Sequence, residues 1–344
     1  MGIVIAILLF GAIIIIHEMG HFLLAKANGI HVYEFSIGLG PTLVGKEIGG
    51  TLFSLKLLPF GGACMMGEDD AEDMSEGSFN SKSVWARISV IAAGPLFNLL
   101  LGWILCIIMV AWMGYYAPVV SSVEEGYSAA EQGIREGDVI TRLDGKKIHL
   151  WEEISLFNLT GSQEDTVELT YERDGAETTV VLERRQLGDD SYARLGITGP
   201  QKPQKAGFFG SMKYGAYTVK YWIDYTFKCL KMLVTGQVGL NQMSGPVGIV
   251  SVVDDTYQSA RPAGTKVVTL SLMNIAILVT ANLGIMNLLP IPALDGGRLV
   301  FLLLEAIRRK RIPPEKEGMV HFAGFALLML LMIVVMFNDI RRLF

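Results

Sequence analysis

The feature that most constrains the fold is a cluster of ionisable side chains, His17, Glu18 and His21, at the end of an apolar run from Ile3 to Ile16. An ionisable group inside an apolar membrane helix costs ~2.5 kcal/mol or more unless it finds a partner. Three such groups within five residues would make a poor spanning helix by themselves. The cluster therefore predicts a helix that meets a compensating charge or a metal ion inside the protein.

The spacing of the two histidines indicates the partner. Residues i and i+4 of a helix share one face, about one turn apart, so the imidazoles of His17 and His21 can chelate one Zn²⁺. Glu18 follows the first histidine directly, where its carboxylate can act as a base on a water at the metal. We therefore expect a zinc site with His17 and His21 as metal ligands and Glu18 as the catalytic residue.

The composition places this helix in a membrane protein that also carries a soluble domain. Of the 344 residues, 51% are hydrophobic and 18% are charged, and the mean hydropathy is +0.41. The first figure is high for a soluble protein, and the second is high for a chain wholly within the bilayer. The net charge of −5, without a clustered basic face, argues against a nucleic-acid partner.

Four segments have the length and apolar character of transmembrane helices, at roughly 3–27, 88–113, 267–289 and 319–337. The connection between the last two is rich in basic residues, which favours the cytoplasmic side. These are Arg298, Arg308, Arg309, Lys310, Arg311 and Lys316. We therefore expect both termini and the long 114–266 region to be extracytoplasmic, and the histidine cluster to face the cytoplasmic side.

The first connection, 28–87, has the pattern of a β-hairpin. Residues 32–37 and 51–57 alternate like strands, and Gly38–Gly40, Gly49–Gly50 and Gly61–Gly62 are expected turns. Such a hairpin can re-enter the bilayer if protein covers its edges, and a free edge can accept an extended peptide. A hairpin lying on the surface is the alternative interpretation.

The region 116–187 changes character, with more charge, more turn residues and short alternating strands. Its sequence of helix, strand, tight turn, helix and two strands resembles a PDZ domain. That fold captures a peptide terminus or an added strand at a sheet edge. Residues 207–235 alternate lysine with aromatic positions, which predicts an amphipathic helix on the outer membrane surface.

The third apolar segment ends in Asn287-Leu288-Leu289-Pro290-Ile291-Pro292-Ala293-Leu294-Asp295-Gly296-Gly297, where two prolines break the helix. Catalytic zinc takes three protein ligands and keeps one position open. The candidates for the third ligand are His31, Glu47, His321 and Asp295. Asp295 alone combines a broken helix, apolar neighbours and the expected cytoplasmic side.

The pairing of His17-Glu18-Met19-Gly20-His21 with the segment 287–297 resembles the site-2 protease family of intramembrane zinc metalloproteases, in its bacterial RseP/RasP branch. The resemblance implies that His17, His21 and Asp295 bind Zn²⁺, that Glu18 is the catalytic base, and that Asn287 and Pro290 hold substrate. The segments Gly38-Leu39-Gly40 and Pro59-Phe60-Gly61-Gly62 resemble the family's re-entrant β-loop, which implies that Gly38 and Gly40 contact substrate. Gly94–Asn98 matches the family's GPxxN motif. One PDZ domain, rather than two, is the departure from the best-known members.

The expected fold is mainly α-helical, with four transmembrane helices, a re-entrant β-hairpin and an inserted extracytoplasmic PDZ domain of α+β type. The expected divisions are 1–115 and 267–344 for the membrane part, 116–200 for the PDZ domain, and 201–266 for the surface helix and linker. Asn98 lies inside the second apolar segment and needs a hydrogen-bond partner, which we expect on another helix or on the substrate.

The expected function is regulated intramembrane proteolysis in a bacterial plasma membrane. The family implies single-pass membrane-protein substrates, such as anti-sigma factors or leftover signal peptides. One alternative is a metal-dependent transporter with a PDZ sensor, although the chain shows neither an internal repeat nor a second charged helix. The other is a catalytically silent scaffold, which the complete set of His17, Glu18, His21 and Asp295 disfavours.

Overall fold

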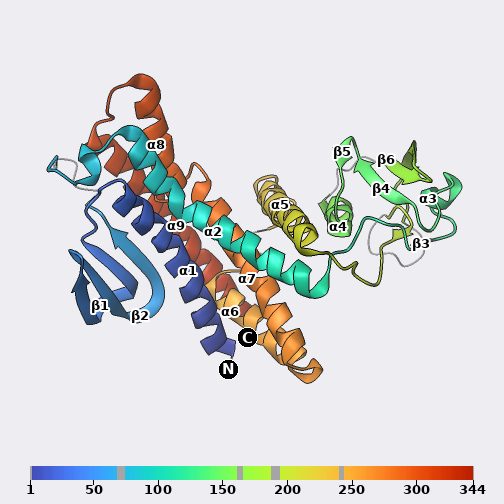
Figure 1. Ribbon diagram of the computed structural model, residues 1–344, viewed down its shortest axis with the longest axis horizontal. Coiled ribbons are helices and arrows are strands. Elements are labelled where there is room, and N and C mark those ends of the chain that lie inside the picture. The colour runs from blue at the N-terminus through green and yellow to red at the C-terminus, as the bar shows by residue number, and fades with distance from the viewer. Residues whose placement is uncertain (1, 68–73, 161–165, 187–193, 240–243, 344) are drawn as a thin grey trace. The chain divides into compact units, whose positions relative to one another are not determined.

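The computed structural model describes residues 2–67, 74–160, 166–186, 194–239 and 244–343 (Figure 1). The chain divides into two compact units. The first, the membrane unit, is Met1–Gly102 with Gly236–Phe344, and the second, the α+β unit, is Trp103–Thr235. Each is described by itself.

The membrane unit is built around long apolar helices. Its elements are α1 (Gly2–Ala27), β1 (Glu34–Ile48), β2 (Thr51–Met65), η1 (Phe79–Ser81), the first part of α2 (Val84–Met113), α6 (Pro246–Ala260), η3 (Arg261–Ala263), α7 (Thr265–Leu288), α8 (Asp295–Arg308) and α9 (Pro314–Leu343). Within the described residues, α1, α2, α7 and α9 are long and apolar enough to cross a membrane. The four predicted spans agree with these helices.

Small residues let the backbones of these helices approach closely. A Cβ at Gly20 of α1 would lie 2.5 Å from the carbonyl oxygen of Ala93 in α2. A Cβ at Gly284 of α7 would lie 2.9 Å from the carbonyl oxygen of Pro95, which stands inside α2. Lipid tails are as apolar as these helices, so the hydrophobic effect does not drive the helices together. Close packing of their backbones supplies much of the attraction instead.

Strands β1 and β2 pair next to α1 (Figure 1), but their path differs from a simple hairpin. Residues 34–37 pair with 52–55 and also with 62–65, while 44–48 pair back onto 51–55. Each strand therefore bends and contributes two segments to one small sheet. The turn expected at Gly49–Gly50 is confirmed, at φ of 58° and 72°.

The turns expected at Gly38–Gly40 and Gly61–Gly62 are wrong, since these glycines lie inside β1 and β2. Gly38, Gly40 and Gly61 take φ of 88°, 90° and 85°, and the register shifts around them. Glycine adopts positive φ without the penalty of a Cβ, so it marks a bend as readily as a chain reversal. The sequence alone does not distinguish the two.

Two helices of the membrane unit were not expected, α6 and α8. Helix α6 begins at Pro246, inside the stretch 201–266 that was expected to hold a surface helix and a linker. The carboxylate of Asp339 in α9 accepts the amides of Gly245 at 3.1 Å and Gly248 at 2.8 Å, which caps that helix from outside. Both helices are short beside the spanning segments, and the cap of α6 is distant in sequence, so the hydropathy pattern does not reveal them.

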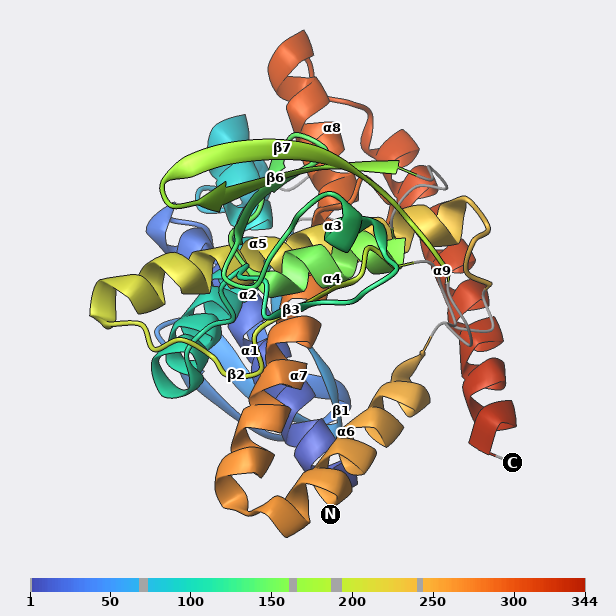
Figure 2. The same cartoon turned by 90° about the vertical axis from the view of Figure 1, so that its right-hand side faces the viewer.

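The α+β unit contains β3 (Ser122–Val123), α3 (Ser128–Glu131), β4 (Val139–Leu143), β5 (Lys146–Lys147), α4 (Trp151–Thr160), β6 (Thr166–Arg173), β7 (Ala176–Glu183), β8 (Ile197–Thr198) and α5 (Phe208–Val234). A four-stranded sheet has the order β5-β4-β6-β7, with β6 and β7 forming a long hairpin (Figure 2). Its core includes the fully buried Ile140, Leu143, Ile154, Leu169 and Leu182. The predicted α+β region and the predicted helix at 207–235 are both present.

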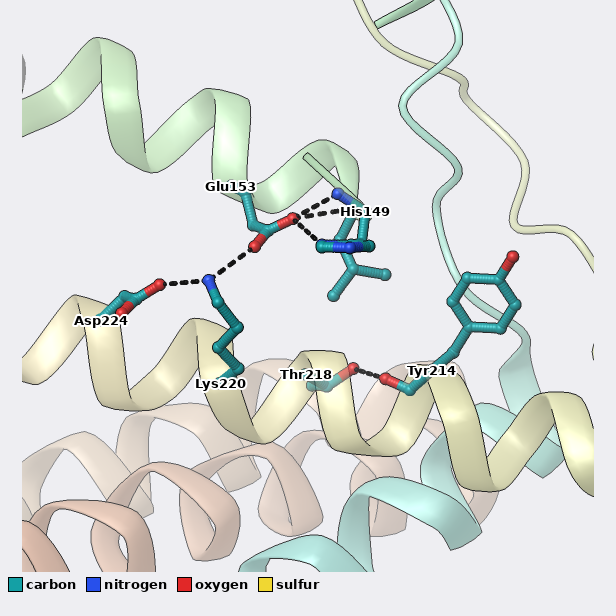
Figure 3. A network of polar contacts seen from close by, with 7 residues as sticks. His149, Glu153, Tyr214, Thr218, Lys220 and Asp224 are labelled. Atoms are coloured by element: carbon teal, nitrogen blue, oxygen red, sulfur yellow. Dashed lines mark hydrogen bonds and ion pairs between the residues drawn. The ribbon is translucent and has the colours of Figure 1, made fainter. Parts of the chain in front are cut away.

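Helix α5 joins this unit through a polar network (Figure 3). Lys220 of α5 lies 3.3 Å from Glu153 of α4 and 2.6 Å from Asp224. Glu153 also accepts the backbone amides of His149 at 2.6 Å and Leu150 at 3.0 Å. The ring of His149 stacks on Tyr217 at 3.8 Å. These contacts tie α4 to α5.

Candidate metal centre

Three side chains from segments far apart in the sequence meet inside the membrane unit. His17 and His21 come from α1, and Asp295 is the first residue of α8. The Asp295 Oδ2 atom lies 3.2 Å from His17 Nε2 and 3.5 Å from His21 Nε2, and the two Nε2 atoms are 3.3 Å apart. We call these residues the donor triad. Among the described residues, they are the group with the composition and spacing to hold a metal ion.

The burial of the donor triad makes a metal ion the natural partner. His17 and His21 are 7% and 6% exposed, and the side chain of Asp295 is 20% exposed. Asp295 Oδ2 is buried and has no hydrogen-bond partner among the described residues. A buried anionic oxygen without a donor is costly unless a cation or protonated group faces it. The donor set thus fits a divalent cation.

Hydrogen bonds from α2 orient the two imidazoles. His21 Nδ1 lies 2.9 Å from the carbonyl oxygen of Val90, so Nδ1 carries the hydrogen and Nε2 offers its lone pair to the centre. His17 Nδ1 lies 3.2 Å from the amide of Asn98, which is completely buried. The atom at this distance is Nδ2, while Oδ1 of Asn98 is buried and has no hydrogen-bond partner in the described structure. Exchanging the two atoms of the carboxamide lets Oδ1 accept from Nδ1 and leaves His17 Nε2 free as a ligand.

The space for the imidazoles exists because α2 has a glycine there. A Cβ at Gly94 would overlap the His21 ring and lie 2.9 Å from Cε1 of His17. Gly94 and Asn98 lie on either side of Pro95, one helical turn apart. The segment predicted from the GPxxN motif therefore lies against both histidines. Gly94 leaves room for their rings, and the amide of Asn98 contacts His17.

Asp295 reaches the centre because the chain folds back sharply after α7. A Cβ at Gly296 would overlap the backbone of Leu288 and Leu289, and one at Gly297 would lie 2.5 Å from the carbonyl oxygen of Ile291. These two glycines let the first turn of α8 pack against the end of α7. A bulkier residue at either position would move the carboxylate before them.

Glu18 occupies a different environment from the donor triad. The backbone amide of Cys64, in the last segment of β2, donates to its carboxylate. A Cβ at Gly62 would lie 3.2 Å from Glu18 Cγ and 3.3 Å from Ile14. The 62–65 segment of β2 thus lies against α1 beside the carboxylate. Of the two glycine segments that resemble the family's re-entrant β-loop, the one that ends at Gly62 in β2 lies beside Glu18, whereas the predicted substrate-binding residues Gly38 and Gly40 lie in β1.

The other predicted site residues are spread over three positions. Asn287, in the last turn of α7, places its amide nitrogen 3.4 Å from His17 Nε2. Pro290 is an exposed residue of the α7–α8 connection. Gly38 is buried within β1 and Gly40 is exposed, next to Leu58. Only Asn98 and Asn287 of this set contact a member of the donor triad in the described structure.

The remaining candidates for the third ligand lie elsewhere. His31 is exposed and pairs edge-to-face with Tyr33 at 4.7 Å, and Glu47 is exposed in β1. His321 of α9 accepts the backbone amide of Ala293 at 2.9 Å. None of the three belongs to the donor triad. A buried centre with three donors and a nearby carboxylate can hold a metal ion and move a proton beside it.

A bundle of apolar helices around two histidines and two carboxylates is the layout of a membrane-embedded metallopeptidase. The model of peptidase family M50 matches residues 5–331. A relative from Clostridium acetobutylicum is 38% identical over 98% of this chain and 97% of its own. The zinc metalloprotease RasP of Bacillus licheniformis and the regulator of sigma-W protease RasP of Bacillus subtilis are each 32% identical, over 98% of both chains. The chain belongs to peptidase family M50.

These matches bear on what the sequence predicted. The predicted family is confirmed, and the predicted enzyme class and zinc cofactor agree with the family and with the names of these relatives. The mainly helical fold with four apolar helices fits a multi-pass membrane protein. Among solved structures, a PDZ domain of an SdrC-like protein from Listeria monocytogenes is 24% identical over 25% of this chain and 88% of its own, at a TM-score of 0.23.

Proposed function

We propose that this protein is an intramembrane zinc metalloprotease that hydrolyses peptide bonds within transmembrane segments of other membrane proteins. The observation that carries the proposal is the geometry of the donor triad. Tetrahedral zinc with bonds of ~2.1 Å places its ligand atoms ~3.4 Å from one another. The three separations between His17 Nε2, His21 Nε2 and Asp295 Oδ2 are 3.2, 3.3 and 3.5 Å. A zinc ion held by these three atoms would keep its fourth position for water or substrate.

Zinc supplies the Lewis acidity that activates water and polarises the scissile carbonyl. Glu18 takes the proton of the attacking water and passes it to the leaving amine. The Cys64 amide holds the Glu18 carboxylate from the side of β2. The amide nitrogen of Asn287 faces the centre, where it can donate to the oxygen that becomes negative in the transition state.

A substrate helix must unwind to expose a peptide bond, and in lipid each lost backbone hydrogen bond costs several kcal/mol. The 62–65 segment of β2 lies beside Glu18, so an unwound substrate strand pairing there would regain those bonds. The surface of the β1–β2 sheet also exposes apolar side chains that suit a bilayer. These are Leu39, Leu43, Val44, Leu55, Leu57 and Leu58. Both features support a re-entrant sheet with Gly38 and Gly40 at its bends.

We assign the α+β unit to the PDZ class, with a peptide terminus or strand as its partner. The support is its order of elements, in which helix α4 follows the short β4–β5 hairpin and precedes the β6–β7 hairpin. The divisions 116–200 for this domain and 201–266 for helix and linker stay predictions. One such domain in the same chain as a protease centre suits recognition of a substrate by a segment outside the membrane.

The cellular setting follows from charge and family. The basic residues between α7 and α9 support a cytoplasmic position for that connection in a bacterial plasma membrane, with the centre toward the cytoplasmic side and the termini and PDZ domain outside. A relative is named a regulator of sigma-W protease. The role proposed for this chain is regulated intramembrane proteolysis. Its substrates would be single-pass proteins such as anti-sigma factors or remnant signal peptides.

The experiment distinguishes the loss of zinc binding from the loss of the catalytic base. Full-length protein is reconstituted in lipid vesicles with a single-pass membrane protein whose helix contains glycine and proline. Glu18→Gln should keep bound zinc and lower cleavage by ~10²-fold or more, because the proton carrier is gone. Asp295→Ala should lose both zinc and cleavage. Elemental analysis and the yield of cleaved product are the two measurements.

Glu47→Gln is the matched control, since Glu47 is an exposed glutamate of β1. It should resemble wild type in both measurements. Undiminished cleavage by Glu18→Gln would remove the base from the mechanism. Passage of metal ions across the vesicle membrane without any proteolysis would instead favour the transporter alternative.

A further inference from the structure

The connection that delivers Asp295 contains a strained residue. Ala293 has a φ of 75°, in the left-handed region that a residue with a Cβ rarely adopts. It is two residues before the aspartate and one before Leu294, which precedes α8. A residue in such a conformation persists only where neighbouring structure holds it. The direction of the chain entering Asp295 therefore depends on what fixes Ala293.

The group that fixes Ala293 comes from α9. The backbone amide of Ala293 donates to Nδ1 of His321 at 2.9 Å. An imidazole that accepts at Nδ1 carries its hydrogen on Nε2, and that atom lies 3.9 Å from Oε1 of Glu317, one turn earlier in α9. The ring also lies 5.5 Å from the ring of Phe301 in α8. The orientation of His321 is thus set by α8, by α9 and by the connection between α7 and α8.

A second contact joins α9 to the same connection. Gly324 lies one turn after His321, and a Cβ there would overlap Cβ of Pro292 and lie 2.8 Å from its carbonyl oxygen. His321 thus accepts from Ala293 while Gly324 makes room for Pro292. Two consecutive residues of the connection rest on one face of α9. This helix contributes no ligand to the donor triad, yet it touches the chain immediately before Asp295.

We propose that His321 is a positioning residue for zinc binding, acting through the backbone of Ala293 on the carboxylate of Asp295. The proposal rests on the zinc site put forward above. His321 holds Ala293 at positive φ, and this conformation aims the first turn of α8 at His17 and His21. Without the acceptor, Ala293 relaxes toward ordinary φ and the third ligand moves away from the histidines.

The experiment compares His321→Leu with His321→Asn in the full-length protein. Oδ1 of asparagine stands where Nδ1 of histidine stands, so it can accept from the Ala293 amide, whereas leucine fills space without accepting. His321→Leu should weaken zinc affinity by about 10-fold to 100-fold, the usual effect of removing a group that orients a ligand. His321→Asn should recover most of that loss. Competition with a chelator of known affinity measures both.

Cobalt spectroscopy gives a readout that does not depend on activity. In protein loaded with Co²⁺, the absorption bands report the geometry of the ligands. His321→Leu should change these bands, and His321→Asn should restore them toward wild type. His31→Leu is the control, because His31 is exposed and outside the donor triad. It should change neither the bands nor the zinc affinity.

The outcomes separate this inference from the proposed function. Wild-type zinc affinity in Asp295→Ala would overturn the zinc site itself. Loss of zinc in Asp295→Ala, combined with wild-type affinity and spectrum in His321→Leu, would overturn only the role of His321. If His321→Leu does not fold, Gly324→Ala tests the same connection from its second contact. It should weaken zinc binding by displacing Pro292, and an unchanged affinity would count against the proposal.

Discussion

The donor triad of the membrane unit and the Lys220 pairs of the α+β unit use polar groups in different ways. In the membrane unit, His17, His21 and Asn98 are buried, and each contacts specific polar partners. In the α+β unit, pairs such as Lys220 with Asp224 lie on the surface, with both side chains about half exposed. Apolar surroundings make an unpartnered polar group costly, whereas water replaces a lost partner on a surface. In the membrane unit, the polar contacts therefore reveal the site.

The largest effect is expected from a substitution that fills the space around the histidine rings and leaves every polar group in place. Gly94→Ala places a methyl group into the His21 ring and 2.9 Å from Cε1 of His17. Because α1 and α2 are already in contact at Gly20, the helices cannot separate without losing that packing. We expect zinc affinity to fall by about 100-fold, near the upper end of an overpacking cost of about 1–3 kcal/mol. Elemental analysis and chelator competition measure the loss.

Gly11→Ala is the matched control for this change. Gly11 also lies in a spanning helix, α1, but a Cβ there meets nothing within 4 Å. Its zinc affinity should equal that of wild type, and helix propensity makes the change slightly favourable. Wild-type zinc binding by Gly94→Ala would show that the imidazoles have more room than the structure gives them.

A smaller effect is expected from the amide that orients His17. Asn98→Ala removes the partner of His17 Nδ1 and leaves the three ligands in place. The imidazole can then rotate, so zinc affinity should fall by about 10-fold to 100-fold, with cleavage falling alongside it. Zinc titration in detergent measures the affinity, and Asn98→Asp should recover part of it because its oxygen also accepts from Nδ1.

Thr280→Val controls for packing near Asn98. The Thr280 hydroxyl donates to the backbone oxygen of Asn98 at 3.0 Å and does not face His17. Its removal should cost stability without a selective loss of zinc. If Thr280→Val weakened zinc binding as much as Asn98→Ala, the amide would have no special role in holding the imidazole.

The same contrast explains how much the sequence could predict. Hydropathy located the four spanning helices, because length and apolar content alone define them. Two histidines at i and i+4, and a carboxylate after a broken helix, indicated the donor triad before any geometry was known. Alternation and Asp-Gly turns located the strands of the α+β unit, where Asp174 and Gly175 take φ of 52° and 81° between β6 and β7.

What the sequence could not predict depends on contacts between distant residues. The cap that Asp339 gives α6 spans more than ninety positions, and the bond between His321 and Ala293 spans 28. Neither contact can be found in a pattern of neighbouring residues in the sequence. The glycines of the β1–β2 sheet were misassigned for a related reason, since positive φ serves a bend and a turn equally. In a lipid-facing protein, such tertiary contacts decide which polar residues belong to the site.

The smallest effect is expected from Lys220→Met in the α+β unit. Burial lowers the pKa of Lys220, but its hydrogen bond to Asp224 and the nearby Asp224 and Glu153 carboxylates raise the net value above 10.5. Its pairs are therefore fully formed below that pH and are lost only as the pH rises through the higher folded-state value. Since the lysine side chain is half exposed, we expect its removal to cost less than about 1 kcal/mol.

Hydrogen exchange of the full-length protein measures this cost at two particular amides. Glu153 still accepts the amides of His149 and Leu150 after Lys220 is gone, so their protection should change little. Glu153→Ala removes the acceptor itself and should lower their protection by about 0.5–2 kcal/mol, as the loss of a helix cap does. A large loss in Lys220→Met would mean that the contact between α4 and α5 depends on one lysine. The α+β unit would then share the sensitivity to single polar contacts that we attribute to the membrane unit.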